Sequence, residues 1–466
     1  MADQPAVVPW RRPGRTGLAL AAALLLLLAL PAAEAPGQDG HAAPASPRSP
    51  QATSTASLTG PGIRPPAASM VPENTNLYAT ACQRHGACWV GGNYQRASGQ
   101  VEPLIARPGH TGFQLRLPGD VPREPAGEPY GEVTGLACTD RTCTAVGDYV
   151  ERVSSASLYY GAFLATEFHG VWRTYLPLLP PHAAPAASQS DTLSAVDCTY
   201  SGFCEAVGNY VDKNGQQELM ALSKPRHRRW GRAVEVKPPD TPSHHPPKLS
   251  GLACPQPGDC VAAGLEQTAT GQYVGLGVSE TDGHWHHAQQ SPVPAGAFRQ
   301  GAFVDALRSV SCPDPQDCVA VGSYAISGSQ YRAMSVLVSH GHFLSATAIP
   351  AVPPGADSKP TTDLAAVSCL SLSECVAVGQ GTNKIGRYVA LEMVLLNGSW
   401  KASYPPPLAN ARLGTFVASS LFSVTCRPAG RCVAAGAYND DSGGIRGRAL
   451  FLTPFSAVGH AMVDPG

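Results

Sequence analysis

The chain has 466 residues, with 33 Lys and Arg against 34 Asp and Glu, and a formal net charge of −1 at pH 7. This balance lacks the basic excess that phosphate backbones require, so it argues against a general nucleic-acid-binding protein. Charged residues make up only 14%, whereas the chain contains 48 Gly and 44 Pro, a composition typical of many short strands joined by turns.

The first 35 residues have the pattern of an export signal. Three arginines precede an unbroken apolar run from Leu18 to Leu30, and small residues follow up to Ala35. The run is shorter than the stretch of about 20 residues that a membrane span requires. We predict a signal peptide over residues 1–35, with an uncleaved membrane anchor as the alternative because Pro36 follows directly. Both interpretations place the rest of the chain outside the cytoplasm, with a membrane reached only through this segment.

Residues 36–70 consist almost throughout of Ala, Pro, Ser, Thr and Gly, without a periodic apolar pattern. Such a segment cannot bury enough surface to offset the entropy lost on ordering, so we predict a disordered linker. Residues 71–466 then form one repeat domain.

Fourteen cysteines fall into seven close pairs, and successive pairs begin 56 to 60 residues apart. The pairs are Cys82 with Cys88, Cys138 with Cys143, Cys198 with Cys204, Cys254 with Cys260, Cys312 with Cys318, Cys369 with Cys375, and Cys426 with Cys432. No cysteine lies outside this pattern, which indicates seven copies of one repeat. We number the repeats one to seven in chain order.

Each repeat reads as two hairpins. The first cysteine ends one β-favouring run and the second begins another, as in Leu307–Cys312 and Cys318–Tyr324, which predicts antiparallel strands a and b. A second pair, strands c and d, follows where Tyr388–Leu396 leads through Asn397-Gly398 into Ser399-Trp400. Asn-Gly and Asp-Gly supply the positive φ angles of a tight turn. We expect the aromatic residue two positions after the glycine to pack between repeats.

Four antiparallel strands in seven copies predict an all-β fold, a seven-bladed β-propeller of four-stranded antiparallel blades. Closing the ring leaves only short, protected strand edges, whereas an open array of sheets, the alternative, exposes the faces of its ends. The last repeat is short, and Gly459–Val463 is its candidate fourth strand.

The cysteine pairs predict one disulfide per blade across the a–b hairpin. Outside the cytoplasm such pairs oxidise, and opposed positions on antiparallel strands lie within disulfide reach. Zinc is the alternative, but it requires closer spacing and four converging ligands. We therefore expect structural disulfides, no metal and no cofactor.

The motif Ser-Cys-x5-Cys-x-Ala-Val-Gly, present at Ser311–Gly322, resembles the repeats of a largely uncharacterised group of exported actinobacterial proteins. The resemblance covers about residues 77–465. The second repeat departs from it, with four residues between its cysteines, and the first has Trp89–Gly92 where others have x-Ala-Val-Gly. The resemblance implies a β-propeller-like fold and export, and it assigns no catalytic residue.

Propellers generally bind ligands on the face that carries the b–c and d–a loops, which here lies opposite the disulfides. The b–c loops are the most polar part of the chain, and loops on a rigid scaffold are where function usually resides. They include Glu151-Arg152, Asp212–Asn214, Glu266-Gln267, Asn383-Lys384 and Asn439–Ser442. The alternative interpretation of each is a solvated turn.

Three further features carry weaker hypotheses. Asn439–Gly444 is rich in oxygen ligands but lacks the spacing of a calcium loop. His284, His286 and His287 suggest a metal, although a surface strand is the simpler interpretation. The turn Ser279–Trp285 is reminiscent of the Asp-box of sialidase-type propellers. No nucleophile elbow and no phosphate loop is present, so no catalytic residue is assigned.

These patterns predict an exported, non-catalytic binding protein, extracellular or at the cell surface, whose loop face recognises a polysaccharide, a cell-wall polymer or a protein, and no nucleic acid. The alternative is a glycan-acting hydrolase or lyase of the sialidase-like propeller type. Carboxylates and arginines converging at the mouth of the ring favour the enzyme, and aromatic and amide side chains favour the binding protein.

Overall fold

The structure is a computed structural model that describes residues 74–452 apart from 85, 97, 108–112, 115–129, 155–156, 169–170, 186–188, 238–242, 406–418, 428–429 and 440–443. The signal segment 1–35, the linker 36–70 and the strand expected at Gly459–Val463 lie outside the described residues. The described residues form strands and turns with no helix among them, so the all-β prediction is confirmed. None of these residues forms a helix long and apolar enough to cross a membrane.

The first two repeats form one eight-stranded sheet. Its strands are β1 (Thr75–Cys82), β2 (Cys88–Gln95), β3 (Val101–Ala106), β4 (Phe113–Gln114), β5 (Tyr130–Cys138), β6 (Cys143–Ser154), β7 (Ser157–Phe168) and β8 (Val171–Tyr175). A single parallel contact between Val101 and Tyr130 joins β3 to β5, and all other pairs are antiparallel.

The next two repeats form separate antiparallel sheets. Repeat three contains β9 (Asp191–Cys198), β10 (Cys204–Val211), β11 (Gln217–Lys224) and β12 (Val234–Val236). Repeat four contains β13 (Ser243–Gln256), β14 (Asp259–Thr268), β15 (Tyr273–Thr281), β16 (His284–Trp285) and β17 (Gln289–Gln290).

The last three repeats follow the same order. Repeat five contains β18 (Asp305–Ser311), β19 (Asp317–Ser327), β20 (Gln330–Ser339) and β21 (His342–Ala348). Repeat six contains β22 (Thr362–Ser371), β23 (Glu374–Thr382), β24 (Tyr388–Leu396) and β25 (Ser399–Ser403). The described part of repeat seven contains β26 (Ser419–Cys426), β27 (Cys432–Asn439) and β28 (Ile445–Leu452).

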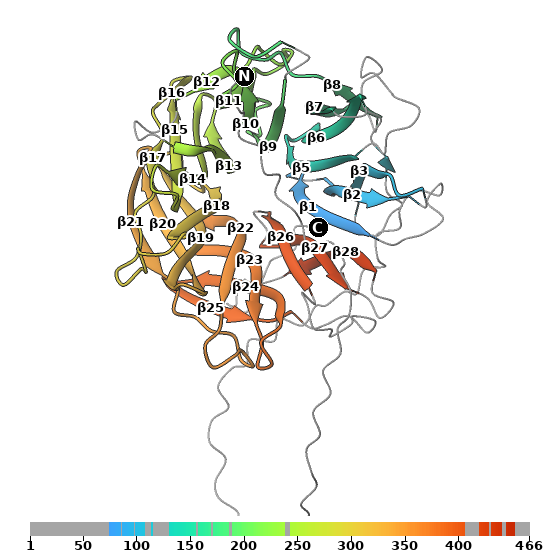
Figure 1. Cartoon of the computed structure of the whole chain (residues 1–466). Helices are drawn as coiled ribbons and strands as arrows, with labels where there is room; N and C mark the ends of the chain where they lie inside the picture. Colours follow the sequence, from blue (N-terminus) through green and yellow to red (C-terminus); the bar gives the residue numbers. More distant parts are fainter. Residues whose placement is uncertain are drawn as a thin grey trace, which may run out of the picture. The chain divides into compact units, whose positions relative to one another are not determined.

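The sheets close into a ring, as a propeller requires. Strand a of each repeat (β1, β5, β9, β13, β18, β22 and β26) contacts strand a of the next, and β26 contacts β1. Figure 1 shows these strands gathered around one axis. Thr80 links repeat one to repeat seven. Its backbone N–H donates to Ser423 Oγ at 3.0 Å, and its hydroxyl lies 2.9 Å from Thr425 Oγ1. The open array is therefore excluded.

The hydrophobic core is divided among the junctions between repeats. The described residues contain seven buried clusters, each built from two repeats that are consecutive around the ring. One of them joins Val321 of repeat five to Leu364 of repeat six, and the closing one joins Leu77 to Val433. Burial therefore stabilises neighbouring repeats jointly, as in other repeat proteins.

The strand-d aromatics pack between repeats as expected. The Trp172 ring meets the Trp89 ring of the previous repeat edge-on, with centroids 5.6 Å apart. The Phe343 ring covers Gly277 so closely that a Cβ at that glycine would lie 2.2 Å from it. The turns that precede strand d in repeats four and six have the predicted positive φ angles, 51° at Asp282 and 50° at Asn397.

The glycine that ends the repeat motif has a specific packing role. At Gly322 a Cβ would lie 1.9 Å from the Ala306 carbonyl oxygen of strand a. The register shifts beside this contact, because Leu307 pairs with Gly322 but Ser309 pairs with Val321. The same bulge and the same clash, at 1.9 or 2.0 Å, occur in all seven repeats. The bulge thus requires glycine on strand b.

The seven predicted disulfides are all present, and each lies within its own repeat. All fourteen cysteines are described, and none of them is free. The bonds join Cys82 and Cys88, Cys138 and Cys143, Cys198 and Cys204, Cys254 and Cys260, Cys312 and Cys318, Cys369 and Cys375, and Cys426 and Cys432. With every thiol oxidised, the zinc alternative for these pairs is excluded, because zinc is bound by thiolates.

The Ser that precedes the first cysteine of the motif ties neighbouring repeats together. Ser311 Oγ accepts a hydrogen bond from the Cys369 backbone N–H at 3.0 Å, and Ser368 Oγ accepts one from Cys426 N–H at 3.0 Å. This residue therefore connects strand a of its own repeat to strand a of the next.

Candidate functional site

Two of the polar b–c loops use their side chains to close their own turns. Asp212 Oδ1 accepts hydrogen bonds from the backbone N–H groups of Asn214 and Gln216, at 2.9 and 2.8 Å. Asn383 Oδ1 does the same for Ile385 and Arg387, at 3.1 and 3.0 Å. These are Asx-type turns, and the interpretation as solvated turns holds for both loops.

Of the other loop predictions, one is wrong and the rest lie mostly outside the described residues. Glu266 is not a loop group at all, because its side chain is buried and accepts a hydrogen bond from Gln290 Nε2 at 2.8 Å. The side chains of Glu151 and Arg152, and most of Asn439–Gly444 with its calcium hypothesis, lie outside the described residues.

The histidine cluster is a surface feature. His284, His286 and His287 are exposed, and Trp285 between them is partly buried with its Nε1–H 3.4 Å from Glu205 Oε1. Within the described part of the chain, no group of three or more His, Cys, Asp or Glu residues is arranged to hold a metal ion. In the Asp-box-like turn, Asp282 contributes its backbone N–H, which donates to Asp259 Oδ1 at 2.8 Å.

A polar group that the loop predictions missed lies in repeats one to four, at the end of strands a and b away from the disulfides. Its positions are the residue before the strand-a Leu or Val and the residue after the motif glycine, which face each other across the a–b pair. We call it the axial cluster, and it comprises Asn76, Asn93, Glu132, Asp148, Asn209 and Lys248 at these positions, together with Tyr130, whose hydroxyl donates to Glu132. Comparison of the repeats could have identified this cluster, because these two positions vary within an otherwise uniform motif.

Glu132 lies at the junction of repeats one and two. Its Oε2 accepts a hydrogen bond from Asn93 Nδ2 at 3.0 Å and a short one from the Tyr130 hydroxyl. Asn93 Oδ1 in turn accepts a bond from Asn76 Nδ2 at 3.4 Å. Amides and a carboxylate from two repeats therefore form one hydrogen-bonded chain beside the axis.

Asp148 lies directly opposite Glu132 in the β5–β6 pair. Burial and the neighbouring Glu132 charge raise the pKa of Asp148 to about 7, opposed by the attraction of Lys248 from repeat four. Its Oδ1 is buried without a hydrogen-bond partner. Asn209, from repeat three, donates to the Pro247 carbonyl at 2.6 Å. Charged groups from repeats two and four thus interact at Asp148, whose carboxyl is poised to gain or lose a proton near neutral pH.

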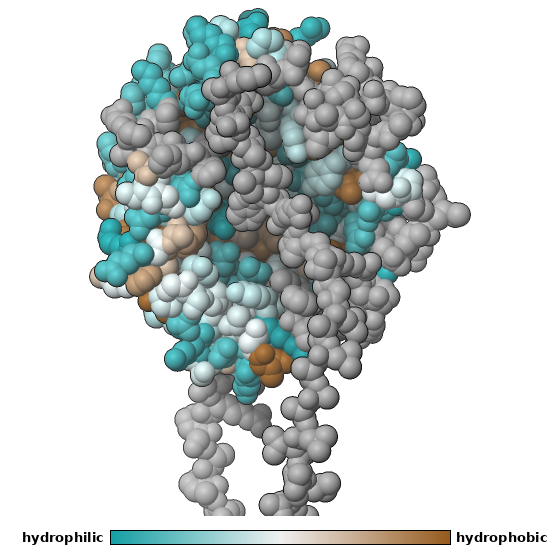
Figure 2. Space-filling model, viewed as in Figure 1, coloured by the Kyte–Doolittle hydropathy of each residue, from teal (hydrophilic) through white to brown (hydrophobic). Residues whose placement is uncertain are grey.

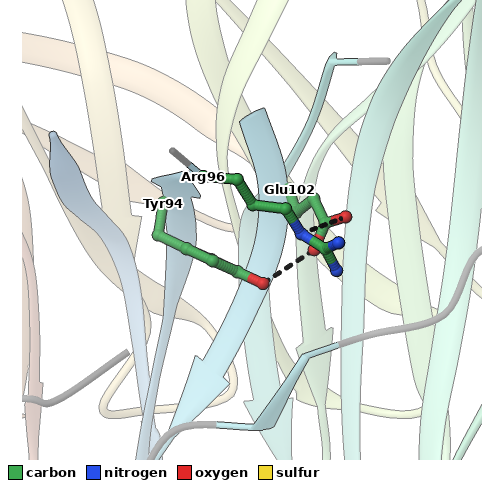
Figure 3. Close-up of polar contacts among 3 residues, drawn as sticks. All are labelled: Tyr94, Arg96 and Glu102. Atoms are coloured by element: carbon green, nitrogen blue, oxygen red, sulfur yellow. Dashed lines mark hydrogen bonds and ion pairs between the residues drawn. The ribbon is translucent and has the colours of Figure 1, made fainter. Parts of the chain in front are cut away.

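A tyrosine, an arginine and an acid meet in repeat one, as Figure 3 shows. The Tyr94 hydroxyl donates to Glu102 Oε2 at 2.7 Å, and Arg96 Nε lies 2.8 Å from Glu102 Oε1. Tyr94 is only 1% exposed, and burial, assisted by Glu102, raises its pKa to about 12. The hydroxyl therefore stays protonated and shielded, so this group fastens β2 to β3 and is no nucleophile.

A pair of buried carboxyl groups lies between repeats three and four. Burial and the charge of Glu280 raise the pKa of Glu205 to about 8, and burial and the charge of Asp259 raise that of Glu280 to about 7. Both Oε2 atoms lack a hydrogen-bond partner. The two carboxyl groups cannot both ionise at this junction without an energetic cost. At neutral pH the pair therefore retains protons that free carboxyls release.

No protein-family model and no curated protein sequence matches the chain. Among solved structures, it is similar to a Hadza microbial sialidase (12% identity, 75% of this chain and 73% of that chain, TM-score 0.40). It is similar also to an α-L-arabinofuranosidase from Fusarium graminearum, solved with an iminosugar inhibitor (13%, 84% and 96%, TM-score 0.37). A sialidase from Trypanosoma rangeli is a third (8%, 80% and 57%, TM-score 0.43). At this level the likenesses assign no function, and the resemblance to exported actinobacterial repeat proteins stays a prediction.

Proposed function

We propose that the chain is an exported, non-catalytic binding protein that holds a hydroxyl-rich ligand, a polysaccharide or cell-wall polymer, at the axial cluster of a seven-bladed propeller. Seven junction clusters and the closure between β26 and β1 support the count of seven blades. Oxidation of all fourteen cysteines supports export, because disulfides persist outside the reducing cytoplasm.

The composition of the axial cluster carries the proposal. Amide and carboxylate groups, which together donate and accept hydrogen bonds, come from three repeats at the same end of the strands, and Lys248 comes from a fourth. Sugar hydroxyls need both kinds of partner, and a few polar groups fixed on a rigid scaffold give a site its specificity. Asp148 Oδ1, buried without a partner among the described residues, is an acceptor that a ligand hydroxyl satisfies.

A glycan-acting hydrolase is the second candidate, and one observation favours it. Glu132 and Asp148 are opposed, and Asp148 has the raised pKa of a general acid. We place it second because amides outnumber carboxylates in the cluster, Lys248 is the only cation in it, and Glu132 is occupied by Asn93 and Tyr130.

The test is co-sedimentation of the purified full chain with insoluble cell-wall and polysaccharide preparations. We expect retention by at least one neutral polysaccharide, and loss of that retention in the double variant N93A/N209A. The comparison variant is N214A/N397A, which removes the same number of amides from exposed turns elsewhere on the ring, and urea unfolding of both variants is measured because Asn93 and Asn209 are buried. Equal retention of both variants removes the axial cluster as the site, and the absence of any retention refutes glycan binding.

A further inference from the structure

A dense group of cations lies at the disulfide end of repeat three. The hairpin between β11 and β12 contains Lys224, Arg226, Arg228, Arg229 and Arg232 within nine residues, without an acidic residue, in a chain whose net charge is −1. The rim where β11 and β12 lie in Figure 1 is strongly hydrophilic in Figure 2. This local excess of positive charge is therefore a feature of one surface and not of the composition.

The fold brings two other segments to this hairpin. Arg84, from the disulfide loop of repeat one, lies over the ring of Tyr200 in the disulfide loop of repeat three, 5.4 Å from its centroid. Gly202 in the same loop packs beside Arg226, since a Cβ there would lie 3.3 Å from Arg226 Cγ. The Arg228 backbone N–H donates to the Pro225 carbonyl at 3.0 Å, so the arginines stand on a defined turn.

These groups are open to solvent. Arg84, Arg226, Arg228 and Arg229 are exposed, and Tyr200 is 48% exposed. Among the described residues, Arg96 and Glu102 form the only ion pair. None of these four arginines is therefore neutralised by an ion pair within the described part of the chain. Asp140 is the exposed acid close enough to act on Tyr200. The result is an exposed aromatic ring with Arg84 over it, in a loop that packs beside Arg226 on a turn of exposed arginines.

We infer that this surface, which we call the basic face (Arg84, Tyr200, Arg226, Arg228 and Arg229), binds an anionic polysaccharide. Guanidinium groups bind carboxylate or sulfate oxygens in a bidentate manner, and the exposed Tyr200 ring holds Arg84 at this surface through the cation–π contact. The basic face lies at the disulfide end of the strands and the axial cluster at the opposite end, so the two sites are independent. One chain could then bridge a neutral and an anionic polymer.

The test is binding of the purified full chain to polygalacturonate and to heparin, with neutral dextran and duplex DNA as comparison ligands. Polygalacturonate presents carboxylates and heparin also sulfates, so the two distinguish the anion. We expect binding to at least one of them that weakens steeply with added NaCl, and weaker binding to duplex DNA.

The triple variant R226A/R228A/R229A should bind at least tenfold more weakly. Its matched control, K359A/K384A/K401A, removes the same charge from exposed lysines in repeat six and should change the affinity less than twofold. Y200A should weaken binding, and Y200F should restore it. Equal losses in the two triple variants, binding to neither polyanion, or a preference for DNA would overturn the inference. Retention on neutral polysaccharide should survive the arginine substitutions, which separates this site from the axial cluster.

Discussion

Replacing the motif glycine of a single repeat by alanine should destabilise the whole ring. In Gly322→Ala the new Cβ would lie 1.9 Å from the Ala306 carbonyl oxygen, whereas real Cβ contacts essentially never fall below 3.0 Å. Strands β18 and β19 must therefore separate by about 1 Å at the bulge. We estimate a loss of about 4 kcal/mol, from two or three weakened backbone hydrogen bonds at about 1 kcal/mol each and a strained junction core.

The assay is urea unfolding followed by tryptophan fluorescence, with the disulfides intact. The control is Gly328→Ala, because no atom lies within 4 Å of a Cβ at that position. We expect Gly328→Ala to unfold within about 0.5 kcal/mol of the parent chain. Unfolding of both variants at the same urea concentration would refute the role assigned to the glycine.

Three further predictions concern stability. The double variant C312S/C318S removes a cross-link between residues six apart, which should cost about 2.4 kcal/mol in a urea titration, and an unchanged midpoint would contradict this. The folded state holds protons on Glu205 and Glu280 that the unfolded chain loses above about pH 4.5. Stability should therefore fall between pH 4.5 and 8, and E205Q should reduce that slope; stability that rises with pH would show the reverse sign. A chain ending at residue 418 lacks β26–β28 and the closing contacts with β1, so it should lose its cooperative transition in calorimetry; a sharp transition would argue against ring closure.

The repeat pattern predicted the strands and the disulfides well because each is a local property of the chain. The cysteine pairs, the β-favouring runs around Cys312 and Cys318, and the Asn397-Gly398 turn specify hairpins within about 40 residues. The bulge was not predicted, because the carbonyl that meets Gly322 belongs to a different strand and only its coordinates reveal the contact.

The candidate site was predicted less well, because it depends on which repeats meet at the axis. Polarity alone singled out Asp212 and Asn383, whose side chains serve their own turns. Asp148 and Lys248 are 100 positions apart in the sequence, and no local pattern connects them. Part of the basic face was missed for the same reason, since Arg84 and Tyr200 belong to different repeats, whereas Arg226, Arg228 and Arg229 form a local run that the polarity of the b–c loops did not single out.

The most direct test of the proposed function is mass spectrometry of soluble sugar after prolonged incubation of the full chain with the polysaccharide that retains it. The binding account predicts that no oligosaccharide appears above the level of a protein-free control, at any pH between 5 and 8. Release of defined oligosaccharides, abolished in the Asp148→Asn variant, would contradict that account and establish the axial cluster as the active site of a glycan-cleaving enzyme.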